Sequence, residues 1–215
     1  TATVVNSKVA SALLHNLGQV RLLQNRDAEA SACFSSAYTV SSSHVEASDV
    51  LVPTLHNLGF VQYRSGNFEA SHATFSEALS FCCTKAETAA TLNCLGVLSF
   101  QIPKCDAKRS LECFHEALAL QTFLYTSQHP VVATTLNNIG RVHYTAGEFA
   151  DALRNYQQAL VLREALLPHD HLDIAATRFN LGQTLHRQGD SNGALRQYQQ
   201  FLKIALPQLG FSHQD

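Results

Sequence analysis

A short motif built around a leucine or isoleucine followed by glycine recurs five times and limits the fold more than any other feature. It reads His-Asn-Leu-Gly at 15–18 and again at 56–59, Asn-Cys-Leu-Gly at 93–96, Asn-Asn-Ile-Gly at 137–140 and Phe-Asn-Leu-Gly at 179–182. Its glycines lie 41, 37, 44 and 42 residues apart. A period of this length indicates units that stack on one another, each too small to bury its apolar face alone.

A second motif follows each glycine: a small residue, an aromatic residue four positions later and, in most copies, alanine three positions after that. The copies are Ala30/Phe34/Ala37, Ser71/Phe75/Ala78, Ser110/Phe114/Ala117, Ala152/Tyr156/Ala159 and Ala194/Tyr198/Phe201. Both motifs have the period of a helix, and turn residues such as Ser65-Gly66-Asn67 separate them. Each unit is therefore predicted to be a helix, a tight turn and a second helix.

The glycine inside each predicted first helix requires a structural reason, because glycine in a helix costs about 1 kcal/mol relative to alanine. We expect the missing side chain to let the second helix approach closely, with the aromatic residue filling the space beyond. The sequence thus predicts an all-α fold, a right-handed α-solenoid superhelix of five helix–turn–helix units.

The expected domain organisation is a single solenoid over residues 1–215. Its units are placed at about 7–42, 48–83, 85–124, 129–166 and 171–206, and 207–215 is expected to start a further linker or repeat, because His213-Gln214-Asp215 echoes His171-Leu172-Asp173. We expect the edge formed by the last helix to be covered by further chain, by a partner or by a second copy, because exposed apolar surface tends to bind something.

The chain resembles the tetratricopeptide family across nearly its whole length. The best match runs from Leu136 through Gly140 and Phe149 to Leu160. The long period and the linker 124–130 resemble the kinesin-light-chain subgroup. The resemblance implies stacked helical pairs with a concave groove that binds proteins.

The match to the family pattern is imperfect in three repeats. Repeat 1 has Asn25-Arg26-Asp27 where glycine and an aromatic residue are usual, and repeat 5 has Arg178 where an apolar residue packs. Repeat 3 carries two extra residues around Ile102-Pro103-Lys104-Cys105, so its turn should bulge.

Three helix starts are predicted from local signals. Thr84 and Glu87 have the spacing of a capping box, Pro53 is expected in a first helical turn, and Pro130 suits a first helical position. His169-Asp170-His171 is interpreted as a helix start rather than a metal site.

Composition narrows the function classes. The net charge of −2 and pI near 6.6 argue against nucleic acid as a partner, because phosphate binding needs a basic surface. No apolar run suits membrane insertion, and no nucleotide-binding, hydrolase or metalloprotease motif occurs. We expect no enzyme activity, no cofactor and no metal. Six cysteines without C-x-x-C spacing suggest the cytoplasm or another reducing compartment inside the cell.

Positions on the first helix of each unit line the groove in the tetratricopeptide family. Mapped onto this chain, the predicted peptide-binding residues are His15, Gln19, His56, Phe60, Tyr63, Arg64, Asn93, Phe100, Asn137, Arg141, Tyr144, Phe179, Gln183, His186 and Arg187. Pro53 and Ala90 fall on the same faces. The set is free of acids and rich in aromatic residues, which are frequent anchors in protein interfaces.

The favoured function is a scaffold or adaptor that binds an extended, polar-to-acidic peptide with bulky apolar anchors. The alternative is a structural subunit, built permanently into a large assembly through its edges or its convex face. Fold alone does not name the client.

Overall fold

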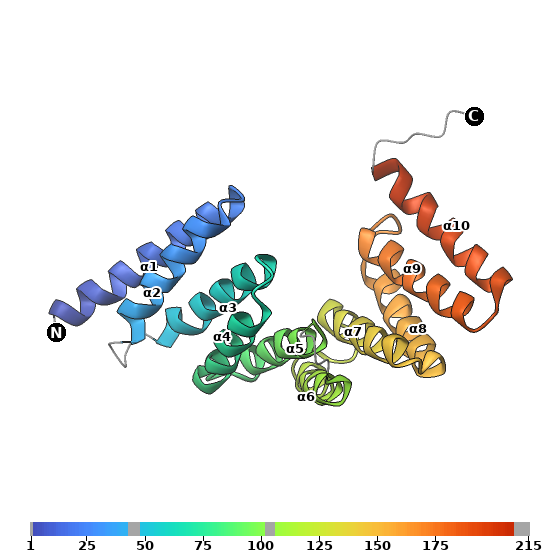
Figure 1. Cartoon of the computed structure of the whole chain (residues 1–215), viewed down its shortest axis with the longest axis horizontal. Coiled ribbons are helices and arrows are strands. Elements are labelled where there is room, and N and C mark those ends of the chain that lie inside the picture. The colour runs from blue at the N-terminus through green and yellow to red at the C-terminus, as the bar shows by residue number, and fades with distance from the viewer. Residues whose placement is uncertain (1, 43–47, 102–105, 209–215) are drawn as a thin grey trace. The chain divides into compact units, whose positions relative to one another are not determined.

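The computed structural model describes residues 2–42, 48–101 and 106–208, and these residues form ten α-helices and no strand (Figure 1). In chain order they are α1 (Ala2–Leu23), α2 (Asp27–Ser42), α3 (Ser48–Arg64), α4 (Phe68–Phe81), α5 (Lys85–Gln101), α6 (Ala107–Tyr125), α7 (Pro130–Ala146), α8 (Phe149–Leu166), α9 (Leu172–Arg187) and α10 (Ser191–Gln208). The helices follow one another as five pairs. The predicted all-α repeat fold is confirmed.

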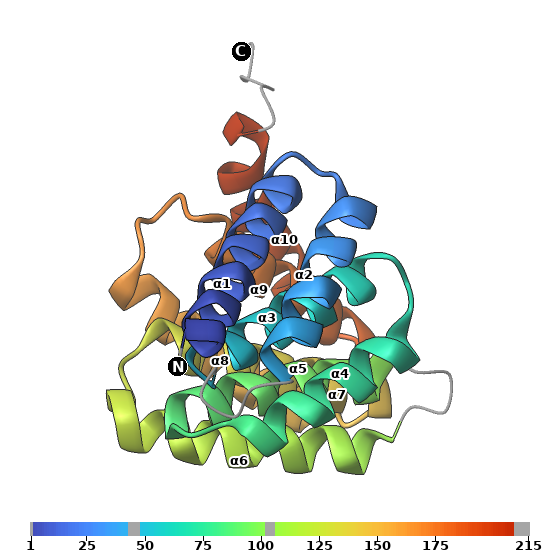
Figure 2. The ribbon, with the colours of Figure 1, turned by 90° about the vertical axis from the view of Figure 1, so that its left-hand side faces the viewer.

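Two compact units divide the chain, residues 1–113 and 114–215, with the boundary inside α6. In unit 1, α1 and α2 lie side by side (Figure 2), and α3 packs on both α2 and α4. In unit 2, α8 packs on α7 and on α9, and α9 packs on α10. The expectation of a single solenoid over residues 1–215 stays a prediction.

The repeated glycines lie under the aromatic residues of the second helices. A methyl group added to Gly140 would lie 2.8 Å from the ring of Tyr156, and one on Gly182 would lie 2.6 Å from the ring of Tyr198. The glycines of the first two repeats meet phenylalanine rings in the same way. The predicted reason for glycine at this place, close approach of the second helix, is confirmed in these four repeats.

The tight turns use a left-handed residue. Gly66, Gly147 and Gly189 have φ of 76°, 80° and 90°, a region that glycine enters without steric cost. In the first repeat Asn25 takes this conformation with φ of 56°, as asparagine does more readily than other residues. Asp27, where an aromatic residue was expected, pairs instead with the guanidinium of an arginine on α3 at 3.2 Å.

Two of the three predicted helix starts are confirmed. Thr84 Oγ1 accepts from the backbone N–H of Glu87 at 3.2 Å, and the Glu87 carboxylate accepts from the Thr84 N–H at 3.0 Å, which completes the capping box. Pro130 is the first residue of α7. The expectation for Pro53 is wrong: α3 already begins at Ser48, so this proline lies inside the helix.

His171 is the N-cap of α9, and its Nδ1 accepts from the N–H of Asp173 at 3.1 Å. The interpretation of this histidine as a helix start is confirmed. The predicted bulge at Ile102-Pro103-Lys104-Cys105 and the predicted further linker after residue 208 lie outside the described residues.

Candidate binding surfaces

A hollow of about 430 Å³ opens between the first helices of unit 1. Residues of α1, α3 and α5 line it: Gln19, Val52, Pro53, His56, Asn57, Ala86, Glu87 and Ala90. Four of these, Gln19, Pro53, His56 and Ala90, are at predicted groove positions. The structure therefore brings together residues that lie far apart in the sequence at one recess.

Glu87 is the one acidic residue among the four lining residues that the sequence mapping did not include. Burial opposes its ionisation, but hydrogen bonds from Thr84 and from the N–H of Cys83, together with nearby His56, hold the pKa of Glu87 below its usual value. A carboxylate thus lines the hollow beside the mapped positions, which themselves contain no acid. The capping box was visible in the sequence, but the direction in which its glutamate faces was not.

Two of the predicted groove histidines bond to the next first helix. His15 Nδ1 lies 2.9 Å from Thr54 Oγ1, and His56 Nε2 lies 2.6 Å from Thr91 Oγ1. Burial lowers the pKa of both imidazoles, although Glu87 partly offsets the effect at His56. His15 is buried between α1 and α3, whereas His56 is half-buried and reaches the hollow.

The threonines in these bonds belong to a repeated buried layer. Four of the fully buried threonines each stand two residues before the first position of the Leu-Gly motif: Thr54, Thr91, Thr135 and Thr177. In unit 2 their partners are Gln121, which accepts from Thr135 at 2.8 Å, and Arg163, which donates to Thr177. The shared place of these threonines was a signal in the sequence that the analysis did not use.

Arg187 and two aromatic rings form the clearest grouping among the predicted groove residues of unit 2. The Arg187 guanidinium lies 5.9 Å from the ring centre of Tyr144 and 5.1 Å from that of Phe149, within the range of cation–π attraction. Asn180 donates to Asn137 at 3.2 Å, which joins α9 to α7. The ring of Phe179 packs on the aromatic residues of α10.

The other predicted groove residues differ in exposure. In unit 1 the Arg64 guanidinium lies 6.0 Å from the ring centre of Phe60, and Tyr63 accepts from Gln101 at 3.4 Å. Asn93, Phe100, Arg141 and Gln183 are half-buried, as are His56, Tyr63, Asn137 and Tyr144. His186 is exposed on the last turn of α9.

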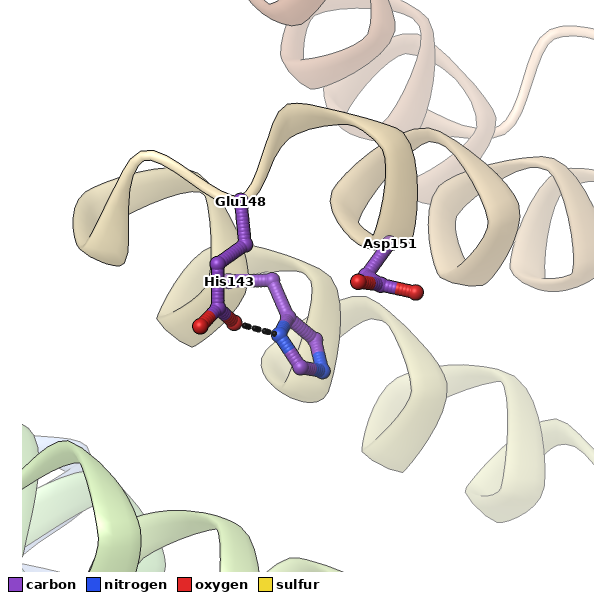
Figure 3. A group of neighbouring side chains, drawn as sticks. All are labelled: His143, Glu148 and Asp151. Carbon is purple, nitrogen blue, oxygen red and sulfur yellow. Dashed lines mark hydrogen bonds and ion pairs between the residues drawn. The ribbon is translucent and has the colours of Figure 1, made fainter.

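A histidine and two carboxylates meet at the turn between α7 and α8 (Figure 3). His143 Nδ1 lies 2.6 Å from a carboxylate oxygen of Glu148, and Asp151 pairs with Arg154 at 3.0 Å. Both acids lie at the N-terminal end of α8, where a helix favours negative charge. The observed contacts are those of side chains that stabilise the turn between α7 and α8.

Two larger hollows lie between successive second helices of unit 2. The first, which we name the α6/α8 groove, has a volume of about 680 Å³ and is lined by Leu118, Thr122, Ser127, Gln128, Val132, Leu136, Arg154, Gln157, Gln158, Val161 and Leu162. The second, the α8/α10 groove, has about 670 Å³ and is lined by Glu164, His169, Asp170, Ile174, Arg178, Gln200, Lys203, Ile204 and Pro207.

The two grooves are the same site one repeat apart. Eight lining positions correspond by a shift of 42 residues: Thr122 to Glu164, Ser127 to His169, Gln128 to Asp170, Val132 to Ile174, Leu136 to Arg178, Gln158 to Gln200, Val161 to Lys203 and Leu162 to Ile204. Arg178, which departs from the family pattern, pairs with Glu164 and donates to Gln197 at 3.1 Å. Equivalent places in two repeats therefore carry different chemistry.

A model of the tetratricopeptide repeat matches residues 87–165 and 146–206, which is more than half of the chain. The chain belongs to the tetratricopeptide repeat family. This family generally mediates contacts between proteins and is generally non-catalytic. No curated protein matches the sequence at a significant level. None of the described helices is long and apolar enough to cross a membrane.

Solved structures of other tetratricopeptide proteins have the same fold. BtubC (BKLC) from P. vanneervenii has a TM-score of 0.78 at 18% identity, over 100% of this chain and 94% of that chain. A putative kinesin light chain from Podosopora anserina has a TM-score of 0.75 at 14% identity, over 94% of this chain and 98% of that chain. A chain of the APC/C hetero-tetramer Cut9-Hcn1 has a TM-score of 0.71 at 20% identity, over 91% of this chain and 33% of that chain. At these identities the likeness concerns the fold.

Proposed function

We propose that this tetratricopeptide protein is a scaffold or adaptor that binds an extended segment of another protein on the faces of its first helices. The observation that carries the proposal is the hollow in unit 1, where α1, α3 and α5 place Gln19, Pro53 and His56 around one recess. Val52 and Pro53 offer apolar contact, and the amides of Gln19 and Asn57 can bond a peptide backbone. Such contacts bind without demanding a single sequence.

The charge preference of the client is assigned to unit 2. Glu87 lines the hollow of unit 1 and disfavours acidic residues there, because like charges repel. Arg187, beside Tyr144 and Phe149, supplies a cation next to aromatic surface. The first-helix face of unit 2 is therefore assigned to an extended client peptide that carries acidic residues and bulky apolar anchors.

Affinity capture from the native extract, read by quantitative mass spectrometry, tests this function. Client proteins retained by the wild-type chain should bind Tyr144→Ala more weakly by about 1–3 kcal/mol, the range for a truncated interface anchor. Ala165→Lys is the matched control, because Ala165 is an exposed residue of α8 away from the first-helix faces. If Tyr144→Ala and Gln19→Ala retain every client at the wild-type level, the first-helix faces do not bind it.

A second candidate function, a permanent structural subunit, is favoured by apolar surface on α1 and α10. Leu13, Leu17 and Val20 are 63%, 43% and 48% exposed, and Leu195 and Leu202 are 55% and 44% exposed. Surface of this kind tends to be covered by a partner. On this view the edges are covered by further chain, a partner or a second copy. Light scattering on the purified chain separates the two functions, because an adaptor stays monomeric and a structural subunit self-associates.

A further inference from the structure

The α6/α8 groove offers a continuous apolar floor that the proposed client site does not use. Leu136 lies at the bottom and is 8% exposed, whereas Val161 on the wall is 66% exposed. Leu118, Val132 and Leu162 extend the floor across three helices. The volume of about 680 Å³ falls in the range of ligand pockets and can admit bulky side chains.

The polar lining of this groove has a definite charge character. None of its lining residues is acidic, and its one formal charge is the guanidinium of Arg154. Arg154 pairs with Asp151 at 3.0 Å, but the side chain of Arg154 is 69% exposed and that of Asp151 is 43% exposed, and ion pairs so open to solvent contribute little. The guanidinium is thus available to a stronger carboxylate partner. The amides of Gln128, Gln157 and Gln158 can donate to and accept from a peptide backbone.

From these contacts we propose that the α6/α8 groove is a second docking site, which takes an extended peptide segment with bulky apolar side chains flanked by an acidic residue. The apolar side chains lie on Leu136 and Val161, the backbone meets the glutamine amides, and the acidic residue pairs with Arg154. This site lies between second helices and goes beyond the proposed function, which uses the first helices.

The α8/α10 groove explains why only one of the two equivalent sites is assigned to this segment. There Arg178 replaces the floor leucine and already bonds Glu164 and Gln197. Lys203 stands where Val161 does in the other groove, and Asp170 where Gln128 does. An apolar side chain bound there would bury charged groups, which is costly. The chain therefore contains its own control, a groove of the same plan with unsuitable chemistry.

A random peptide library displayed on phage, selected on the full chain, tests the proposal, and fluorescence polarisation then measures the enriched peptides. We expect peptides that combine acidic with bulky apolar residues. Val161→Lys, which introduces the residue found at the equivalent place in the next repeat, should weaken a class of them by about tenfold or more, the effect of losing an interface anchor. Ala165→Lys adds the same charge to α8 outside the groove and should leave their binding unchanged.

A charge reversal at Arg154 tests its proposed pairing with the acidic residue of the peptide. Arg154→Glu should reduce binding of the acidic peptides and, in a fresh selection, enrich basic ones. The proposal is overturned if Val161→Lys and Ala165→Lys have equal effects, or if Arg154→Glu leaves the selected charge unchanged. It is also overturned if no peptide is enriched, or if every enriched peptide is lost with Tyr144→Ala and kept by Val161→Lys. That last result would place binding on the first helices and support the proposed function alone.

Discussion

The fourth and fifth repeats share a backbone plan but fill the same space with opposite chemistry. Between α6 and α8 the floor residue is Leu136, and Thr122 stands nearby on the wall. Between α8 and α10 the equivalent residues are Arg178 and Glu164, which pair. The repeat therefore fixes where side chains meet, and the individual residues decide whether the place is apolar or charged.

The two changes in the α8/α10 groove, Arg178 on α9 and Glu164 on α8, depend on one another. A charge in a half-buried place is tolerated when a partner of opposite sign accompanies it, whereas an unpaired one is strongly destabilising. The side chain of Arg178 is 21% exposed and that of Glu164 is 42% exposed, so the pair lies at the border of solvent. This coupling predicts different costs for the same exchange made in the two repeats.

The largest effect is expected for Leu136→Arg in the fourth repeat. The new charge would lie at an almost buried place, with Thr122 where the α8/α10 groove has Glu164, so the free energy of unfolding should fall by about 3 kcal/mol or more. Urea denaturation followed by circular dichroism measures it. Adding Thr122→Glu should recover part of the loss, because it recreates the Arg178–Glu164 pair of the α8/α10 groove. If the double variant is no more stable than the single one, the partner does not decide the cost.

The glycine contact should also differ between the two repeats. Gly140→Ala should cost about 2–3 kcal/mol, because the new methyl group meets Tyr156, which is 2% exposed and has little room to move. Gly182→Ala should cost about 1 kcal/mol, the low end for overpacking, because Tyr198 lies nearer the solvent and can shift. Thermal unfolding of both variants checks the order. Equal losses would show that exposure of the ring has no influence.

In unit 1 the buried threonines bond to His15 and His56, and these histidines predict a pH dependence of the stability. Burial lowers the pKa of His15 and His56 below the ordinary value of 6.5. The unfolded chain therefore binds protons at pH values where the folded chain does not. This contribution to stability is fully present above about pH 6.5 and is lost as the pH falls below it.

We expect the amides of α1 and α3 to lose hydrogen-exchange protection between pH 7.5 and 5 once intrinsic exchange rates are corrected, with a smaller effect than that of the glycine substitutions. His15→Gln should reduce the change, because glutamine can bond Thr54 without taking up a proton. His15 is the better test, since the Glu87 carboxylate offsets the shift at His56. An unchanged pH response in His15→Gln would contradict the assignment.

The smallest effect is expected for Arg178→Leu, the reverse of the first exchange. Leucine is the residue found at this place in the fourth repeat, and replacing a paired charge by a fitting apolar residue is often neutral. Glu164, whose side chain is 42% exposed, can stay hydrated. The free energy of unfolding should change by less than about 1 kcal/mol, again by urea denaturation. A loss as large as that of Leu136→Arg would show that the pair itself holds α8 and α10 together.

The candidate sites were only partly predictable from the sequence. Positions such as Gln19 and His56 were mapped by family resemblance, and the structure places both on one hollow. The same mapping gave no warning that His15 would be buried against Thr54. Neither the carboxylate of Glu87 in the hollow nor the grooves between second helices could be derived, because both depend on contacts between separate helices.

By itself the sequence determined the helical pairs, the tight turns between them and the capping box. These features depend on local spacing, in which residues three, four or five positions apart share a helical face or close a turn. Only the tertiary structure decided which of those faces stay exposed, and that Arg178 and Glu164 meet across two helices. Residues 14 to 43 positions apart come together through packing, and burial then sets their charge state and their access to a partner.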